Sequence, residues 1–211
     1  MLTVHHLNNS RSQRILWLLE ELGVDYDIRA YQRDPESRRA PAVLKTVHPL
    51  GKSPVIEHDG LVVAETGAII VYLLDTFDAD PALRPERGTQ DFIDYVHFLH
   101  FAEGSAMLPL LLALYTGFLG EAAKPIQPLI TNEIRSVLDY CEYSLIRSAW
   151  FAGGRLSGAD FNMIFPLEAA RARGLLKGYD ACNAYIDRVW ARPAYRRALE
   201  RGGDYDYGPK G

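Results

Sequence analysis

The segment Leu50–Thr66, LGKSPVIEHDGLVVAET, combines several features of a site for an extended, peptide-like ligand. Pro54 stands between a polar loop and an apolar pair, which predicts a rigid turn that a cis peptide bond would suit. Asp59-Gly60 predicts the turn of a hairpin, and Glu65-Thr66 begins an apolar stretch with helical spacing. The first peptides of such a helix present free N–H groups to a bound anion. A backbone edge beside Pro54 and this helix start therefore indicate a ligand that carries carboxylates.

The residues on either side of this segment predict an α/β domain. Leu2–Leu7 and Tyr26–Tyr31 have the composition of strands, and between them a helix runs from Arg11 until Gly23 ends it. A short helix at Pro41–Val47, the hairpin and a helix at Thr66–Phe77 complete the domain. The order is βαβ followed by αββα, which is the order of a thioredoxin-like domain.

A break in both periodicities separates this domain from a second one that is all helical. The stretch Asp78–Gly88, DADPALRPERG, is rich in Pro and Asp, and residues 79–88 form the predicted linker, so we expect domains at 1–78 and 89–201 and a loose tail at 202–211. Ser157, with Asp160 three residues later, predicts a capping box at the start of the helix Phe161–Ala172. That helix is apolar on nearly every side, so we expect it to be buried.

Composition limits the class of protein. The chain has 211 residues, of which 48% are apolar, and this is enough for one large or two small hydrophobic cores. A net charge of −4 argues against a nucleic-acid partner. The two cysteines, Cys141 and Cys182, lie far apart, which argues against a disulfide framework or a zinc cluster and favours a reducing compartment. The chain shows no targeting pattern and no uninterrupted run of eighteen apolar residues, so we expect a cytoplasmic protein without a membrane partner.

The ordered series in Leu50–Thr66 resembles the glutathione-binding half of the cytosolic glutathione transferases. Val4–Gly23 and His97–Tyr115 are similar to a serine-type bacterial and fungal subgroup of that family, and the resemblance covers about Met1–Arg201. It implies a thioredoxin-like domain followed by an all-α domain, glutathione as the co-substrate, and a homodimer.

The resemblance also implies the residues that hold glutathione. These are Lys52, Ser53, Pro54, Glu65, Thr66 and Glu103. The backbone beside Pro54 would pair with the cysteinyl part, and the acid–hydroxyl pair at 65–66 would hold the γ-glutamyl end. Lys52 would reach the glycine carboxylate, and Glu103 would approach the γ-glutamyl amine held by the other subunit. Each residue also has a plain structural alternative, because loop lysines and first-turn acids are common.

Catalysis with glutathione requires its thiolate, and each pKa unit of depression needs about 1.4 kcal/mol of stabilisation. Ser10, in the turn before the first helix, matches the catalytic serine of serine-type transferases when Arg14 is aligned with the arginine that follows it in them. The structural alternative is an ordinary N-cap serine. Asn9 is a side-chain donor one residue away and could share or take over the thiolate contact. The turn holds no Tyr and no Cys, which disfavours tyrosine-type and mixed-disulfide mechanisms.

Two further groups lie on predicted helices of the second domain. Met107, Leu111, Tyr115 and Phe118 could line an apolar co-substrate pocket or could equally be core. His97, His100 and Glu103 lie three apart and could bind a metal in principle. We expect these three residues to line either the interface between two subunits or the cleft between domains, and we expect no metal.

The sequence therefore predicts a detoxifying glutathione transferase that conjugates hydrophobic electrophiles and reduces hydroperoxides as a side activity. A glutathione-dependent disulfide reductase is one alternative, because two bound glutathiones need no protein cysteine. The other is a non-catalytic binding or regulatory module, since a fold does not determine a function.

Overall fold

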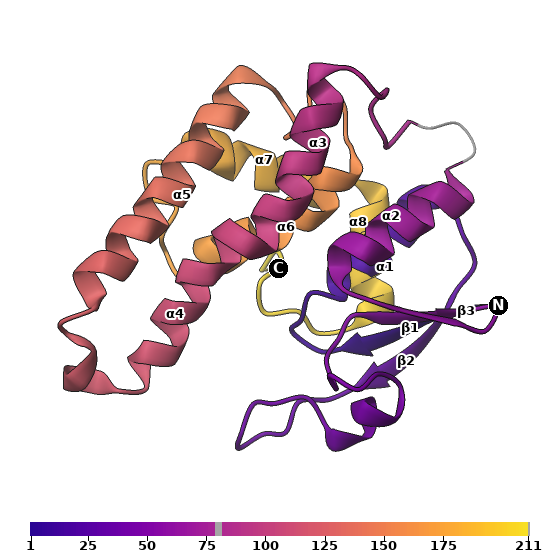
Figure 1. The fold of residues 1–211 in the computed structure, drawn as a ribbon, viewed down its shortest axis with the longest axis horizontal. Coiled ribbons are helices and arrows are strands. Elements are labelled where there is room, and N and C mark those ends of the chain that lie inside the picture. Colours follow the sequence, from indigo (N-terminus) through magenta and orange to yellow (C-terminus); the bar gives the residue numbers. More distant parts are fainter. Residues whose placement is uncertain (79–81, 211) are drawn as a thin grey trace. The chain divides into compact units, whose positions relative to one another are not determined.

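The computed structural model describes residues 1–78 and 82–210 (Figure 1). The chain forms two compact units, Met1–Ala82 with Val189–Gly211, and Leu83–Arg188. Part of the predicted linker, residues 79–81, lies outside the described residues.

The first unit contains a four-stranded sheet in the order β2-β1-β3-β4. Its elements are β1 (Leu2–Leu7), α1 (Gln13–Leu22), β2 (Asp27–Tyr31), the 3₁₀ helix η1 (Ala42–Thr46), β3 (Val55–His58), β4 (Leu61–Ala64) and α2 (Thr66–Phe77). β1 pairs with β2 in parallel and with β3 antiparallel, and β3 and β4 form the predicted hairpin. The predicted thioredoxin-like order is confirmed.

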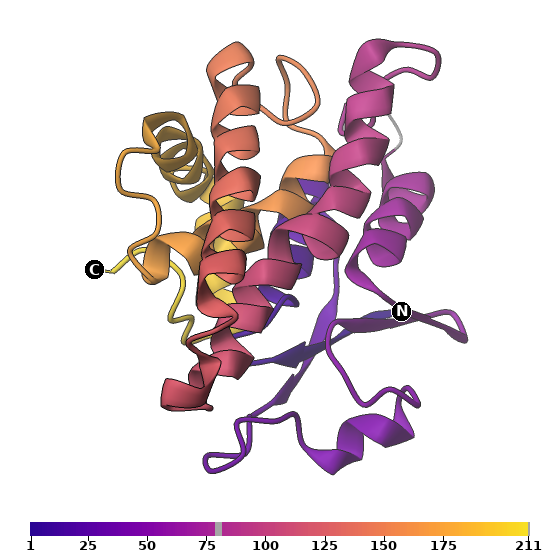
Figure 2. The ribbon, with the colours of Figure 1, turned by 60° about the vertical axis from the view of Figure 1, so that its left-hand side comes forward.

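Helices α1 and α2 lie on one side of this sheet, and the segment with η1 lies on the other (Figures 1 and 2). The apolar residues of α1 that recur at helical spacing, such as Ile15 and Leu19, are completely buried, as are Ile70 and Leu73 of α2. Gly23 ends α1 with a φ of 65°, a left-handed conformation that glycine adopts without strain.

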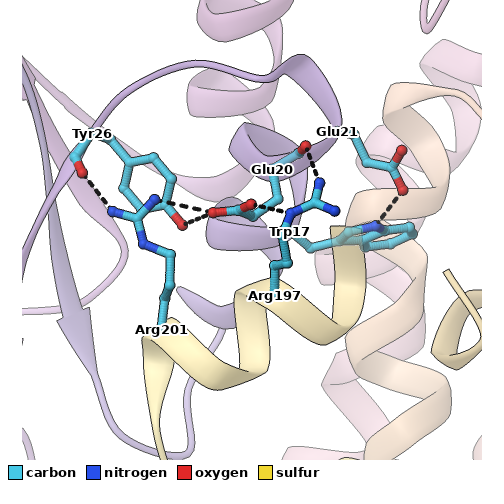
Figure 3. A network of polar contacts seen from close by, with 6 residues as sticks. All are labelled: Trp17, Glu20, Glu21, Tyr26, Arg197 and Arg201. Carbon is cyan, nitrogen blue, oxygen red and sulfur yellow. Dashed lines mark hydrogen bonds and ion pairs between the residues drawn. The ribbon is translucent and has the colours of Figure 1, made fainter. Parts of the chain in front are cut away.

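The last helix, α8 (Pro193–Gly202), belongs to the first unit and packs on α1. Figure 3 shows why: the Glu20 carboxylate accepts hydrogen bonds from Tyr26 Oη at 2.9 Å, Arg197 Nε at 2.8 Å and Arg201 Nη1 at 3.1 Å. The Arg201 guanidinium also lies 3.7 Å from the centre of the Tyr26 ring. The predicted domain at 89–201 includes α8, whereas the structure places this helix in the first unit. Local periodicity carries no information about such pairing between distant segments.

The second unit is helical throughout its regular structure, as predicted. It contains α3 (Gln90–Phe101), the π-helical turn η2 (Ala102–Ala106), α4 (Met107–Gly117), the 3₁₀ helix η3 (Gly120–Ala123), α5 (Gln127–Arg147), α6 (Gly158–Ala172) and most of α7 (Asp180–Trp190). α4 and α5 run side by side (Figure 2). Residues Gln90–Gly117 form one stretch that could cross a membrane by length and composition alone, a test that core helices of soluble proteins also pass.

α6 is the buried centre of this unit, and its predicted capping box is present. Asp160 Oδ2 accepts from the Ser157 backbone N–H at 2.8 Å and from Ser157 Oγ at 3.1 Å, and Asp160 Oδ1 accepts from Phe151 N at 3.0 Å. Burial raises the pKa of Asp160 to about 6, although these hydrogen bonds act in the opposite direction.

Candidate active site

The turn between β1 and α1 places Ser10 at the end of a short hydrogen-bond chain. Ser10 is only 3% exposed, its Oγ lies 2.8 Å from Ser12 Oγ, and it accepts a hydrogen bond from Ser12 N at 3.2 Å. Ser12 rather than Ser10 occupies the N-cap position of α1. The Ser10 hydroxyl is therefore held in place by the residues behind it.

Asn9, the alternative thiolate donor, uses its side chain in another way. Its Nδ2 donates to Asp206 Oδ2 at 2.8 Å, and its Oδ1 accepts from Asp206 N at 2.8 Å. The Asn9 carbonyl accepts from Arg33 Nη2 at 3.1 Å. The predicted loose tail thus holds this turn through Asp206.

Two residues that sequence analysis did not select lie directly behind Ser10. Ser12 Oγ lies 2.9 Å from His6 Nδ1, and His6 Nε2 donates to the Gly202 carbonyl at 3.0 Å. His6 is buried, and this burial lowers its pKa below 6.5. The alternation of side chains along β1 predicts that His5 and His6 point to opposite faces of the sheet. The contact of His6 with Gly202 of α8 joins residues almost two hundred positions apart, so no local sequence pattern predicts it.

The segment before β3 has the predicted geometry. The Ser53–Pro54 peptide bond is cis, and Ser53 Oγ donates to the His5 carbonyl at 2.8 Å. β3 is paired on both sides, so the backbone that could meet a peptide-like ligand lies ahead of Val55, at Ser53 and Pro54. Lys52, in the same loop, is exposed.

The start of α2 supplies the acid–hydroxyl pair. Glu65 is exposed and has a φ of 70°, which costs a residue other than glycine about 1 to 3 kcal/mol. Thr66 is buried, and its Oγ1 accepts from Arg14 Nη2 at 3.0 Å. Arg14 thus ties the beginning of α1 to the beginning of α2, a role that its position in the sequence did not indicate. The strained backbone at Glu65 turns this residue out to solvent at the N-terminus of the helix.

The predicted residues of the second unit are less closely grouped. Glu103 lies in the η2 turn, Met107 is buried and Leu111 is half-buried. Tyr115 and Phe118, by contrast, are 60% and 79% exposed. Within this unit, a cavity of about 280 Å³ lies between α4, α5 and the segment with Arg173 and Leu175, and none of the four predicted pocket residues lines it.

The histidine group on α3 has ordinary contacts. Tyr140 Oη and His97 Nε2 lie 3.1 Å apart, and the His97 ring stacks on Phe101. In residues 1–78 and 82–210, no group of three or more His, Cys, Asp or Glu side chains could hold a metal ion. Cys141 and Cys182 are buried thiols.

Comparison with known proteins supplies the family. Residues 1–75 match the model of the glutathione S-transferase N-terminal domain, and residues 107–193 match that of the C-terminal domain. Glutathione S-transferase 3 of Schizosaccharomyces pombe is 34% identical over 95% of this chain and 88% of its own length. Glutathione S-transferase 1 of Saccharomyces cerevisiae is 30% identical over 95% of both chains.

The fold gives the same result. The crystal structure of a glutathione S-transferase from Actinobacillus pleuropneumoniae superimposes with a TM-score of 0.91, at 35% identity, over 98% of this chain and 95% of that one. The chain belongs to the glutathione S-transferase family and is a glutathione transferase that uses glutathione as its co-substrate.

Proposed function

We propose that Ser10 is the residue that stabilises the glutathione thiolate, and that Asn9 supports the turn rather than the sulfur. One observation carries this proposal: the Asn9 amide is occupied at both ends by Asp206, with two contacts of 2.8 Å. The Ser10 hydroxyl is held from behind by the Ser12 N–H at 3.2 Å. A hydroxyl that accepts a hydrogen bond donates its own proton more strongly, because neighbouring hydrogen bonds polarise one another.

The remaining predicted residues would orient the tripeptide. The backbone at Ser53 and Pro54 would pair with the cysteinyl part, Lys52 with the glycine carboxylate, and the exposed N-terminus of α2 at Glu65 and Thr66 with the γ-glutamyl end. Free N–H groups and the positive end of the helix dipole favour a carboxylate at that helix start. Arg14, 3.0 Å from Thr66 Oγ1, fixes the hydroxyl in that position.

The thiolate would attack hydrophobic electrophiles, and reduction of organic hydroperoxides would use the same sulfur. Fixing the reactants and stabilising the anion would provide the rate enhancement without a covalent enzyme intermediate. The enzyme would work in the cytoplasm as a homodimer, and Glu103 would approach the glutathione of the other subunit. These last features are typical of the family.

Calorimetry of glutathione binding, together with the ultraviolet absorbance of the bound thiolate, tests the assignment of Ser10. Ser10→Ala should retain binding, lose the thiolate signal near neutral pH and lower kcat/KM about 10- to 100-fold. A hydrogen bond to a charged group contributes about 1.5 to 3 kcal/mol, which corresponds to that range.

Asn9→Ala is the discriminating variant and Ser37→Ala, on the exposed loop beside Asp34, is the control. If Ser10→Ala keeps full activity and Asn9→Ala loses it, Asn9 is the thiolate donor. Binding without any thiolate in the wild-type protein would favour a disulfide-reducing or non-catalytic role.

A further inference from the structure

His6, Ser12 and Ser10 form a chain of hydrogen bonds that starts at the Gly202 carbonyl. The contact with this carbonyl determines which group donates and which accepts in each of the other bonds. The Gly202 carbonyl can only accept, so His6 Nε2, at 3.0 Å, carries a proton. Burial lowers the pKa of His6 from 6.5, so the ring is neutral at neutral pH and its Nδ1 has no proton. His6 Nδ1 is therefore an acceptor.

The two serines then have one consistent arrangement. Ser12 has a single hydroxyl proton, which it donates to His6 Nδ1 at 2.9 Å, while the Leu7 carbonyl is more distant at 3.3 Å. In the 2.8 Å contact between the serines, Ser10 is therefore the donor and Ser12 the acceptor. The Ser10 proton points inward, and a lone pair of its oxygen stays available to a group that approaches from outside.

We propose that His6 is the proton-accepting end of this chain: it takes up the thiol proton of glutathione through Ser12 and Ser10. The proposal rests on the proposed function, since it requires that Ser10 meets the sulfur. His6 does not touch glutathione and acts as a positioning residue for the two hydroxyl groups.

The step moves one proton at each link. The S–H bond of glutathione breaks as its proton binds Ser10 Oγ, the Ser10 proton moves to Ser12 Oγ, and the Ser12 proton moves to His6 Nδ1. The products are a thiolate and an imidazolium, so the total charge is unchanged. Every hydroxyl then points outward, with Ser10 donating to the thiolate, which is the arrangement that stabilises the anion. After the sulfur has reacted, His6 loses its proton along the same chain or to water.

The surroundings of His6 suit this cycle. The groups that face its ring nitrogens are Ser12, at the start of α1, and the Gly202 carbonyl of α8, and neither carries a charge. Burial keeps the resting ring neutral, whereas the Gly202 carbonyl favours the imidazolium. His5 offers a contrast on the same strand: its ring contacts Tyr31 Oη at 2.8 Å and Glu57 at 3.1 Å and has no link to Ser10 in the described residues.

The first experiment compares His6→Asn with its matched control His5→Asn. The amide oxygen of the introduced side chain can still accept a hydrogen bond from Ser12 but cannot take up a proton. We expect His6→Asn to bind glutathione and to shift the midpoint of the thiolate absorbance upward by at least one pH unit, with kcat/KM at neutral pH about 10-fold lower. His5→Asn should leave the midpoint unchanged. An unshifted midpoint in His6→Asn would overturn the proposal.

A second measurement needs no substitution at His6. Nitrogen-15 NMR of the wild-type imidazole should show a neutral ring in the free protein and two protonated nitrogens in the glutathione complex near neutral pH. A ring that stays neutral beside a bound thiolate would overturn the proposal even if His6→Asn does not fold. Ser12→Thr, which keeps the hydroxyl, should retain the wild-type midpoint, and Ser12→Ala should raise it.

These outcomes separate this inference from the proposed function. A thiolate that depends on Ser10 but is indifferent to His6 and Ser12 would overturn the proton chain alone. A complex in which Ser10→Ala has no effect would overturn both.

Discussion

Each unit of this transferase contains a buried polar cluster, and the two clusters differ in how they end. The Asp160 cluster, formed by Asp160, Ser157 and the Phe151 N–H, is closed: its carboxylate accepts three hydrogen bonds, at 2.8, 3.0 and 3.1 Å, all from within α6 and the loop before it. The serine cluster, formed by His6, Ser12 and Ser10, begins at the Gly202 carbonyl and ends at the Ser10 hydroxyl, where we propose that the glutathione sulfur binds.

This difference distinguishes a buried polar cluster that stabilises the fold from one that we propose takes part in the chemistry. Burying a polar group is costly unless it is hydrogen bonded, and both clusters meet that requirement. The closed cluster leaves its carboxylate nothing to offer a substrate, so its value lies in the start of α6. The open cluster lies in the turn between β1 and α1. In that turn Asn9, the residue before Ser10, has a positive φ of 50°.

Removing the centre of the closed cluster should have the largest effect on stability. We expect Asp160→Ala to lower the free energy of unfolding by about 3 to 5 kcal/mol, because the donors at Phe151 and Ser157 stay buried without an acceptor. Ser10→Ala, at the open end, leaves one buried donor, the Ser12 N–H, without its Ser10 acceptor and should cost less, about 1 to 2 kcal/mol. Urea denaturation of both variants measures the difference.

The exposed Asp187, paired with Arg171 at 2.6 Å, provides the control. Asp187→Ala should cost at most about 1 kcal/mol, as surface ion pairs do. If Ser10→Ala proves more destabilising than Asp160→Ala, the distinction between the two clusters is wrong.

The pH dependence of the closed cluster should give the next largest effect. The folded-state pKa of Asp160 is about 6, above the 3.8 of the unfolded chain, so the native state binds this proton more tightly. The free energy of unfolding should therefore rise as the pH falls from 7 to 5, by about 1 kcal/mol relative to Asp160→Asn. Other groups, including Glu20 with its lowered pKa, are common to both proteins and cancel in the comparison.

Urea denaturation of the wild type and of Asp160→Asn at pH 7 and pH 5 measures this difference. A difference that stays constant, or that grows as the pH rises, would mean that the hydrogen bonds to Asp160 outweigh its burial.

The same contrast explains how much could be predicted from the sequence. The capping box of α6 was predictable because Ser157 and Asp160 lie three residues apart. The turns at Pro54 and at Asp59-Gly60 were predictable because these residues restrict or permit the conformation of their own backbone. Local chemistry of this kind, with the family resemblance, was sufficient for the fold class.

The rest depended on partners that are distant in sequence. The contacts of His6 with Gly202 and of Asn9 with Asp206 join segments at opposite ends of the chain, and Glu20 meets Arg197 and Arg201 in the same way. No periodicity encodes such pairs. For the same reason helical spacing alone could not determine whether Tyr115 and Phe118 line a cavity.

The smallest expected effect concerns the support of the open cluster. Asp206→Ala should change the free energy of unfolding by less than about 0.5 kcal/mol, since its contact with Asn9 is exposed. The substitution removes the carboxylate contact with Asn9 Nδ2 but keeps the Asp206 N–H contact with Asn9 Oδ1, so the turn is loosened rather than released. The looser turn should nevertheless raise the KM for glutathione a few-fold with little change in kcat, because part of its ordering is then left to glutathione binding. Asp204→Ala, in the same segment, is the matched control. Steady-state kinetics of both variants measures kcat and KM. A higher kcat/KM for Asp206→Ala would mean that the Asn9 amide, once released from Asp206, stabilises the thiolate. Asn9 would then replace Ser10 as the thiolate donor.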